Sequence, residues 1–217
     1  MLSVTSLVDS DVREAADLHR QVLDMEFLTR FGPGFMRTYY RAWLHSPGAI
    51  TLVARDDDGV VVGVVLGASD PALHVRAMVK GYGVRLALAI LARALIHPRL
   101  AWDLAVTRGR RYARGLARLV IGRLRSRGVA STGEPVDSVG EITHVLVRPD
   151  AQGRGVGRAL IDAAVAAARL ARVHELTLVT PPDMAARHFY ERLGWRPDGE
   201  MRSQSGEEFL RFRLRLD

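Results

Sequence analysis

The chain has 217 residues, 48% of them hydrophobic, and a formal net charge of +7. This length suits one domain with a substantial core, and the lack of cysteine excludes disulfides and thiolate metal sites. The seven histidines lack metal-ligand spacing, so we expect no metal. With no signal-peptide pattern and no apolar run of membrane-spanning length, we expect a soluble, cytoplasmic protein.

The first part of the chain alternates between strand and helix patterns. Residues 3–7 predict a strand, and Asp9 or Ser10 begins an amphipathic helix. A Gly-Pro turn leads into a second predicted helix, Phe35 to Leu44. Its aromatic side chains favour a core position over a substrate groove, because aromatics at helical spacing usually pack inward. They are Phe35, Tyr39, Tyr40 and Trp43.

Two β-branched runs follow, at residues 50–55 and 60–66. An Asp-Gly pair separates them, which is typical of a hairpin. The sequence therefore predicts two adjacent antiparallel strands.

A basic segment occupies residues 70–138. Between residues 71 and 128 there are thirteen Arg or Lys and one acidic residue, Asp103, a net charge of +12, whereas the rest of the chain carries −5. Hydrophobic patterns predict helices at 84–96 and 110–127 and a short segment at 100–106. Residues 130–138 are polar and predict a connecting loop. The segment fits a lid over an anionic acceptor, a lipid-binding surface or a nucleic-acid patch, and equally a solvated subdomain or homodimer interface.

A predicted strand from Gly140 to Val147 leads into a glycine-rich loop. Pro149 stops the strand, and glycines at 153, 155 and 157 precede a long alanine-rich helical pattern. Glycine lets the backbone approach a ligand closely, and the unpaired N–H groups of a helix N-terminus bind anions. The loop therefore predicts a site for a pyrophosphate, although a plain linking turn is the alternative.

The residues of this loop do not match two other phosphate-binding motifs. A Rossmann fingerprint needs a third glycine where the chain has Arg158. A Walker A loop needs Gly-Lys-Ser/Thr, and the sole lysine is Lys80.

A second segment of the chain matches the same family as the glycine-rich loop, which makes the resemblance specific. The pattern Gln152-x-x-Gly155-x-Gly157 is followed, about thirty residues on, by a helix pattern that ends in Gly-Trp. Together they resemble the motifs of the GNAT acetyltransferase superfamily, with Asp183 standing where asparagine is usual. The matching helix positions are Asp183, Ala186, Tyr190, Gly194 and Trp195.

The resemblance implies an α/β GNAT fold. We expect one domain over residues 1–217, with a mixed, mostly antiparallel twisted sheet of about seven strands flanked by helices. The helical insertion, residues 70–138, would lie between strands three and four. The resemblance also implies acetyl-CoA as co-substrate, bound without a metal. Its binding residues would be Val145, Leu146, Val147, Gln152, Gly153, Arg154, Gly155, Val156, Gly157, Arg158, Asp183 and Arg187.

Candidate catalytic residues follow from the same resemblance. Glu141 lies eleven residues before Gln152, where the histone-acetyltransferase branch places its glutamate base. His144 is the alternative base, on the opposite face of a regular strand unless a bulge intervenes. Tyr190 is the candidate general acid for the departing thiolate. Leu178 occupies the position where some relatives have a second glutamate.

These residues predict acetyl transfer from acetyl-CoA to an amine in a ternary complex. The basic insertion favours a small anionic acceptor, such as an amino sugar nucleotide or an amino acid derivative. A protein or peptide acceptor, and a CoA-binding regulatory module without turnover, remain alternatives. Nucleic acid and membrane partners stay open for the insertion alone.

Overall fold

The computed structural model describes most of the chain. The described residues are 2–24, 27–97, 139–182, 185–202 and 208–216.

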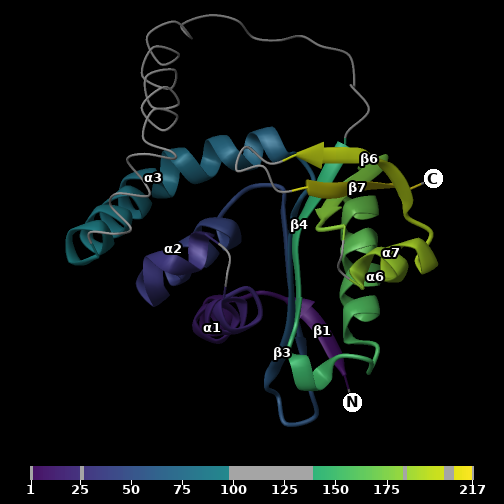
Figure 1. Cartoon of the computed structure of the whole chain (residues 1–217), viewed down its shortest axis with the longest axis horizontal. Helices are drawn as coiled ribbons and strands as arrows, with labels where there is room; N and C mark the ends of the chain where they lie inside the picture. Colours follow the sequence, from purple (N-terminus) through teal and green to yellow (C-terminus); the bar gives the residue numbers. More distant parts are fainter. Residues whose placement is uncertain (1, 25–26, 98–138, 183–184, 203–207, 217) are drawn as a thin grey trace, which may run out of the picture.

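A seven-stranded sheet forms the centre of the molecule (Figure 1). The strand order is β1-β2-β3-β4-β5-β7-β6, and every neighbouring pair is antiparallel except β4 and β5. The predicted α/β fold with about seven mostly antiparallel strands is therefore confirmed. The strands are β1 (Ser3–Ser6), β2 (Ala49–Arg55), β3 (Val61–Ala68), β4 (Val139–Val147), β5 (Glu175–Thr180), β6 (Arg196–Arg202) and β7 (Glu208–Arg215).

Helices cover both faces of this sheet. In the view of Figure 1, α1, α2 and α3 lie on one side and α6 and α7 on the other. The helices are α1 (Val12–Val22), α2 (Gly32–Leu44), α3 (Pro71–Ile96), α6 (Val156–Leu170) and α7 (Ala186–Arg192). Short 3₁₀ turns are η1 (Asp9–Asp11), η2 (Phe27–Phe31) and η4 (Pro149–Ala151).

Each face of the sheet has its own hydrophobic core. One core packs α1 and α2 against the sheet, and the other packs α6 and α7 against it. All eight residues of β3 are buried, which explains its continuous apolar sequence. The four aromatic side chains of α2 are at most 8% exposed, so the prediction that they belong to the core is confirmed.

Several predicted boundaries differ from the structure. Helix α3 begins at Pro71, thirteen residues before the predicted start. The Asp70 carboxylate caps it by accepting from the Leu73 N–H at 2.9 Å, and a proline in the first turn is favourable. Gly81 and Gly83 weaken the sequence pattern without ending the helix.

Two further differences concern α2 and β6. Helix α2 begins at Gly32 rather than Phe35, again with a proline in its first turn. Strand β6 was not predicted from sequence, because Arg196–Arg202 is largely polar and exposed. The predicted pieces at 100–106, 110–127 and 130–138 lie outside the described residues. Within the described residues, no helix is long and apolar enough to cross a bilayer.

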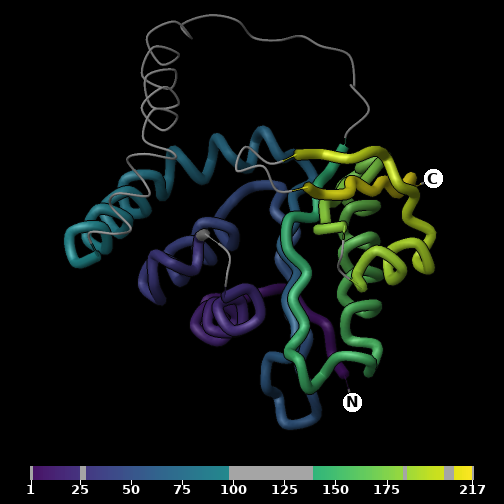
Figure 2. Tube along the Cα trace, in the orientation of Figure 1, coloured from purple at the N-terminus to yellow at the C-terminus, as the bar shows by residue number. Residues whose placement is uncertain are grey.

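The tube view in Figure 2 shows the surroundings of strand β4. Strand β4 runs between the two helical layers, and its far end leads through η4 into α6. The edges of β4 therefore decide what can bind between the layers.

Candidate active site

Strands β4 and β5 pair over a short stretch and then part. Their parallel ladder joins residues 139–142 to residues 175–178 and goes no further, although β4 continues to Val147. The β3–β4 register shifts in the same place, because Leu66 pairs with His144 but Gly67 pairs with Ile142. The extra residue, Thr143, forms a bulge. Strand β4 therefore turns away from β5 just past Ile142, which leaves an opening between the two strands.

The register decides which backbone groups face the opening. The Arg148 N–H donates to the Val62 carbonyl of β3 at 2.8 Å. Because an antiparallel ladder alternates, we infer that Leu146 also bonds toward β3, while the backbone groups of Val145 and Val147 face the opening. Of the predicted cofactor-binding residues Val145, Leu146 and Val147, the first and the last therefore direct their backbone groups to that side, where the Val147 carbonyl accepts from Gln152 Nε2.

The glycine-rich loop lies at the end of β4. Gly153 and Gly155 have φ angles of +73° and +81°, which L residues rarely adopt, and a Cβ at either would meet no atom within 4 Å. Gly155 is the N-cap of α6, so the first N–H groups of the helix lack intrahelical partners. Gln152 Nε2 lies 3.4 Å from the Val147 carbonyl oxygen, which links the loop to the opening. The loop has the conformation of an anion-binding helix start.

The other predicted loop residues surround this helix start. Val156 is buried in the α6 core, whereas Gly157 lies beside Phe189 of α7. Arg154 and Arg158 are exposed, and Arg158 Nε lies 3.4 Å from Asp162. Both guanidinium groups can reach solvent in front of the loop.

The bulge brings Glu141 and His144 to the same face of the sheet. Ile142 belongs to the α6 core, and a Cβ on Gly140 would contact the same core, so Glu141 between them points toward α1 and α2. The His144 ring lies against rings of those two helices. The structure therefore contains the bulge that the sequence left open as an alternative. As a result, the two candidate bases lie on the same face of the sheet.

A buried polar cluster surrounds His144. Its ring centroid is 4.8 Å from that of His19 on α1 and 6.3 Å from that of Tyr39 on α2. His19 Nδ1 in turn lies 3.0 Å from the Tyr40 hydroxyl, and both residues are fully buried. His19 was not predicted from the sequence as a site residue, because nothing local links it to β4.

Tyr190 lies in the core under α7. It is 7% exposed, and its ring packs edge-on against Trp195 and tilted against Phe212. Burial raises the pKa of the phenol to about 12. The hydroxyl therefore stays protonated throughout the neutral range.

The remaining predicted residues on this side have different surroundings. Arg187 is exposed and binds Glu191 at 3.1 Å, and its hydrogen bond lowers the pKa of that carboxyl. Asp183 lies outside the described residues. Leu178 is buried in the α6 core and faces away from Glu141. Within the described part of the chain, no three His, Asp or Glu side chains are placed to hold a metal ion.

Known proteins share this fold. Residues 128–195 match the sequence profile of the Acetyltransferase (GNAT) family. YncA of Salmonella typhimurium, solved with its cofactor acetyl-CoA, has a TM-score of 0.58 and 14% identity over 100% of this chain and 94% of its own. The chain resembles the GNAT acetyltransferases in sequence and in fold. No curated protein sequence matches it.

Two further GNAT neighbours differ in their acceptors. Spermidine N-acetyltransferase SpeG of Vibrio cholerae, in a mutant form, has a TM-score of 0.59 and 14% identity, covering 99% of this chain and 94% of its own. A ribosomal-protein alanine N-acetyltransferase of Escherichia coli has a TM-score of 0.57 and 13% identity, covering 100% and 95%. At such identities the GNAT likeness establishes the fold, and the acceptor has to be argued from this chain's own residues.

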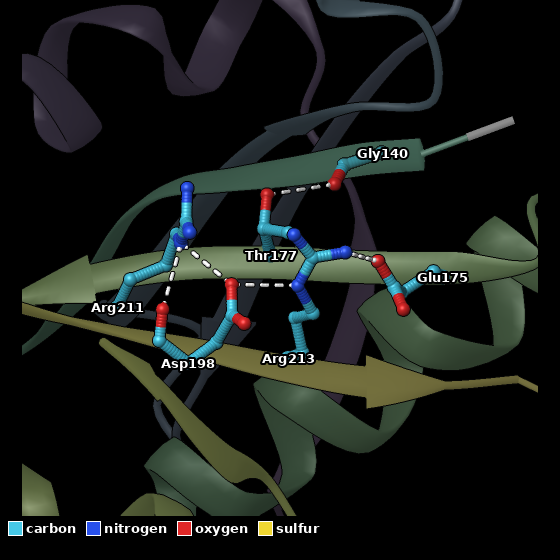
Figure 3. A network of polar contacts seen from close by, with 6 residues as sticks. All are labelled: Gly140, Glu175, Thr177, Asp198, Arg211 and Arg213. Carbon is cyan, nitrogen blue, oxygen red and sulfur yellow. Dashed lines mark hydrogen bonds and ion pairs between the residues drawn. The ribbon is translucent and has the colours of Figure 1, made fainter.

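A network of polar contacts extends across β4, β5, β6 and β7 (Figure 3). Glu141, Thr177 and Arg213 occupy one row across β4, β5 and β7. Asp198 Oδ2 accepts from Arg213 Nε at 2.6 Å and from Arg211 Nε at 2.7 Å. The Arg213 bond holds the pKa of Asp198 below its usual value.

Arg213 bonds through Nε and one terminal amino group in this network, whereas Arg211 bonds through Nε alone. Arg213 also binds Glu175 through Nη1, but both described partners of Arg211 are bound by its Nε. In Figure 3 the Arg211 guanidinium extends from β7 across β5 toward β4. Among the described residues, neither terminal amino group of Arg211 therefore has a partner in the network.

The loop geometry makes a first prediction. Gly155→Ala places a side chain at a positive φ, so we expect stability to fall by about 1–2 kcal/mol and the loop backbone to move. Acetyl-CoA affinity, measured by calorimetry, should fall with it.

Gly199→Ala is the matched control for that substitution. Gly199 has a φ of +95° and open space around its Cβ, but it lies on the edge strand β6. It should lose similar stability and keep its affinity for acetyl-CoA. Equal affinity losses in both variants would contradict the assignment of the loop.

Proposed function

We propose that the protein transfers an acetyl group from acetyl-CoA to an amine by direct attack in a ternary complex. One observation carries this proposal: β4 leaves β5 beside the glycine-rich start of α6, with two candidate bases on the face toward α1 and α2. A pyrophosphate would bind the loop N–H groups, with Arg154 or Arg158 adding charge. The pantetheine arm would then run along β4 between the parted strands.

Glu141 supplies the base in this mechanism. An amine reaches the site largely as ammonium and must lose a proton before its lone pair can attack the thioester carbon. As the C–N bond forms, the free amide of Val145 or Val147 would stabilise the carbonyl oxygen. The C–S bond then breaks, and the proton that the attacking nitrogen gives up as the amide forms passes to the departing sulfur or to solvent.

Tyr190 serves the departing sulfur. Because its pKa is about 12, the phenol is a hydrogen-bond donor at neutral pH. A thiol has an ordinary pKa near about 8.5, so the phenol would stabilise the leaving thiolate by hydrogen bonding before any proton moves. The raised pKa therefore favours a hydrogen bond from Tyr190 to the thiolate over transfer of its proton.

Arg211 gives the acceptor its class. The network around Asp198 contains two arginines and two carboxylates, so its net charge is close to zero, but both terminal amino groups of Arg211 have no described partner in it. Arg211 lies on β7, beside the part of β5 that no longer pairs with β4. We propose that its terminal amino groups bind a carboxylate or phosphate of a small acceptor whose amine lies at Glu141. A protein or peptide acceptor would not depend on this contact.

Removal of the base should separate chemistry from binding. Glu141→Gln keeps the shape of the side chain, and we expect kcat to fall by about 100-fold or more while acetyl-CoA affinity stays unchanged. Thiol release across a pool of amines measures the rate, and Tyr190→Phe should also lower kcat.

Two variants control this experiment. Glu208→Gln removes an exposed strand glutamate at the start of β7 and should leave the rate unchanged. If His144→Gln abolishes turnover while Glu141→Gln does not, His144 is the base. Tight acetyl-CoA binding with no turnover on any acceptor would favour a regulatory module.

The acceptor proposal has its own test. Arg211→Gln should raise the KM of an acidic amine about tenfold to a hundredfold, because a charge-assisted hydrogen bond is lost, and leave the KM for acetyl-CoA unchanged. Arg215→Gln, on the same face of β7, is the matched control and should change neither. Equal rates with peptides and with the matching neutral amines would contradict an anionic acceptor.

A further inference from the structure

Helix α3 carries an unusual share of the exposed apolar surface. Among the described residues, fifteen large apolar side chains are exposed, and eight of them belong to this helix. They are Leu73, Val75, Val79, Val84, Leu88, Leu91, Leu95 and Ile96. Soluble proteins rarely expose large apolar groups in such concentration unless a partner covers them.

The two sides of α3 have different environments. Its inner side packs on the α1–α2 core through Met78, Leu86, Ala89 and Ile90. The outer side contains an apolar row, Val84, Leu88, Leu91 and Leu95, which falls within about 60° around the helix axis. These four side chains are 59% to 86% exposed. Figure 1 shows α3 beyond α2, with its later turns extending away from the sheet.

The charges on α3 select the partner. The helix contains four basic residues and no acidic one. Arg76, Lys80 and Arg85 are exposed, whereas Arg93 lies on the inner side against Gly32. Two copies of so basic a helix would repel each other, and like charges at an interface cost free energy. An anionic partner would be attracted.

Apolar side chains flanked by cations match one kind of surface. A helix that lies in the interface of a bilayer buries its apolar row among the acyl chains and places Lys and Arg at anionic headgroups. Lys80 lies one turn before Val84 on the outer side, and Arg76 one turn earlier, so cations and apolar side chains share the accessible surface. The chain also continues with nine arginines and one acidic residue before residue 129, which adds attraction of the same sign.

We propose that the outer face of α3, defined by Arg76, Lys80, Val84, Leu88, Leu91 and Leu95, docks the protein on the surface of an anionic lipid bilayer. Docking through α3 would leave the glycine-rich start of α6 accessible to acetyl-CoA from solution, because α3 and α6 lie on opposite sides of the sheet (Figure 1). The enzyme would then act on amines at or near a membrane surface.

Vesicle sedimentation with the full chain tests this proposal. We expect binding to vesicles of equal parts phosphatidylglycerol and phosphatidylcholine, weaker binding at high salt, and little binding to phosphatidylcholine alone. Arg76→Gln with Lys80→Gln should weaken binding to the anionic vesicles by about fivefold per charge. Leu91→Gln with Leu95→Gln should abolish it.

The control variant changes a leucine outside α3 that is as exposed as Leu95. Leu170 ends α6 and is 87% exposed, compared with 86% for Leu95. Leu170→Gln should therefore bind vesicles as the wild type does, whereas Leu95→Gln alone should bind more weakly. Melting temperatures of all variants confirm that each is folded.

Three results would overturn the proposal. The first is no binding to anionic vesicles at low salt. The second is binding that the α3 variants leave unchanged, which would place the contact elsewhere in the chain. The third is a dimer in solution, seen by light scattering, that Leu95→Gln converts to a monomer, since the face would then pair with a second copy.

Discussion

Backbone hydrogen bonding between β4 and β5 stops after Ile142 and Leu178, and the site depends on that break. A buried backbone N–H without a partner costs free energy, so two strands that part must leave their free groups to solvent or to a ligand. Val145 and Val147 face the opening in this way. A thioester arm that lies along β4 would satisfy those groups and place its carbonyl beside them.

The two hydrophobic cores hold the strands in this arrangement. Ile142 packs on the α6 side and Leu146 on the α1–α2 side, which a regular strand could not do with that spacing. The bulge at Thr143 reverses the alternation between them. Gly67 opposite the bulge is required because a Cβ there would lie 2.8 Å from the Glu141 carbonyl oxygen. Packing therefore enforces both the opening and the shared face of Glu141 and His144.

Local patterns predicted much of this fold. The glycine-rich loop, the hairpin at β2 and β3 and the apolar run of β3 depend on neighbouring residues, so the sequence was sufficient to find them. The start of α3 had a local signal in Asp70 and Pro71, which two glycines further along the helix concealed.

Other features depend on contacts that no local pattern contains. The His19–Tyr40 pair beside His144 joins residues on two helices and a strand. Asp198 meets Arg211 and Arg213 only because of the β6–β7 register, and β6 itself is too polar to be recognised as a strand. Nor could the pattern of α3 show that its outer row stays uncovered in the described structure.

Hydrogen exchange measured with and without acetyl-CoA tests the central claim most directly. If the cofactor lies along β4 and on the start of α6, peptides covering residues 143–158 should gain protection, while those covering the later turns of α6, residues 162–170, should not change. Protection elsewhere, with residues 143–158 unchanged at saturating acetyl-CoA, would contradict the account.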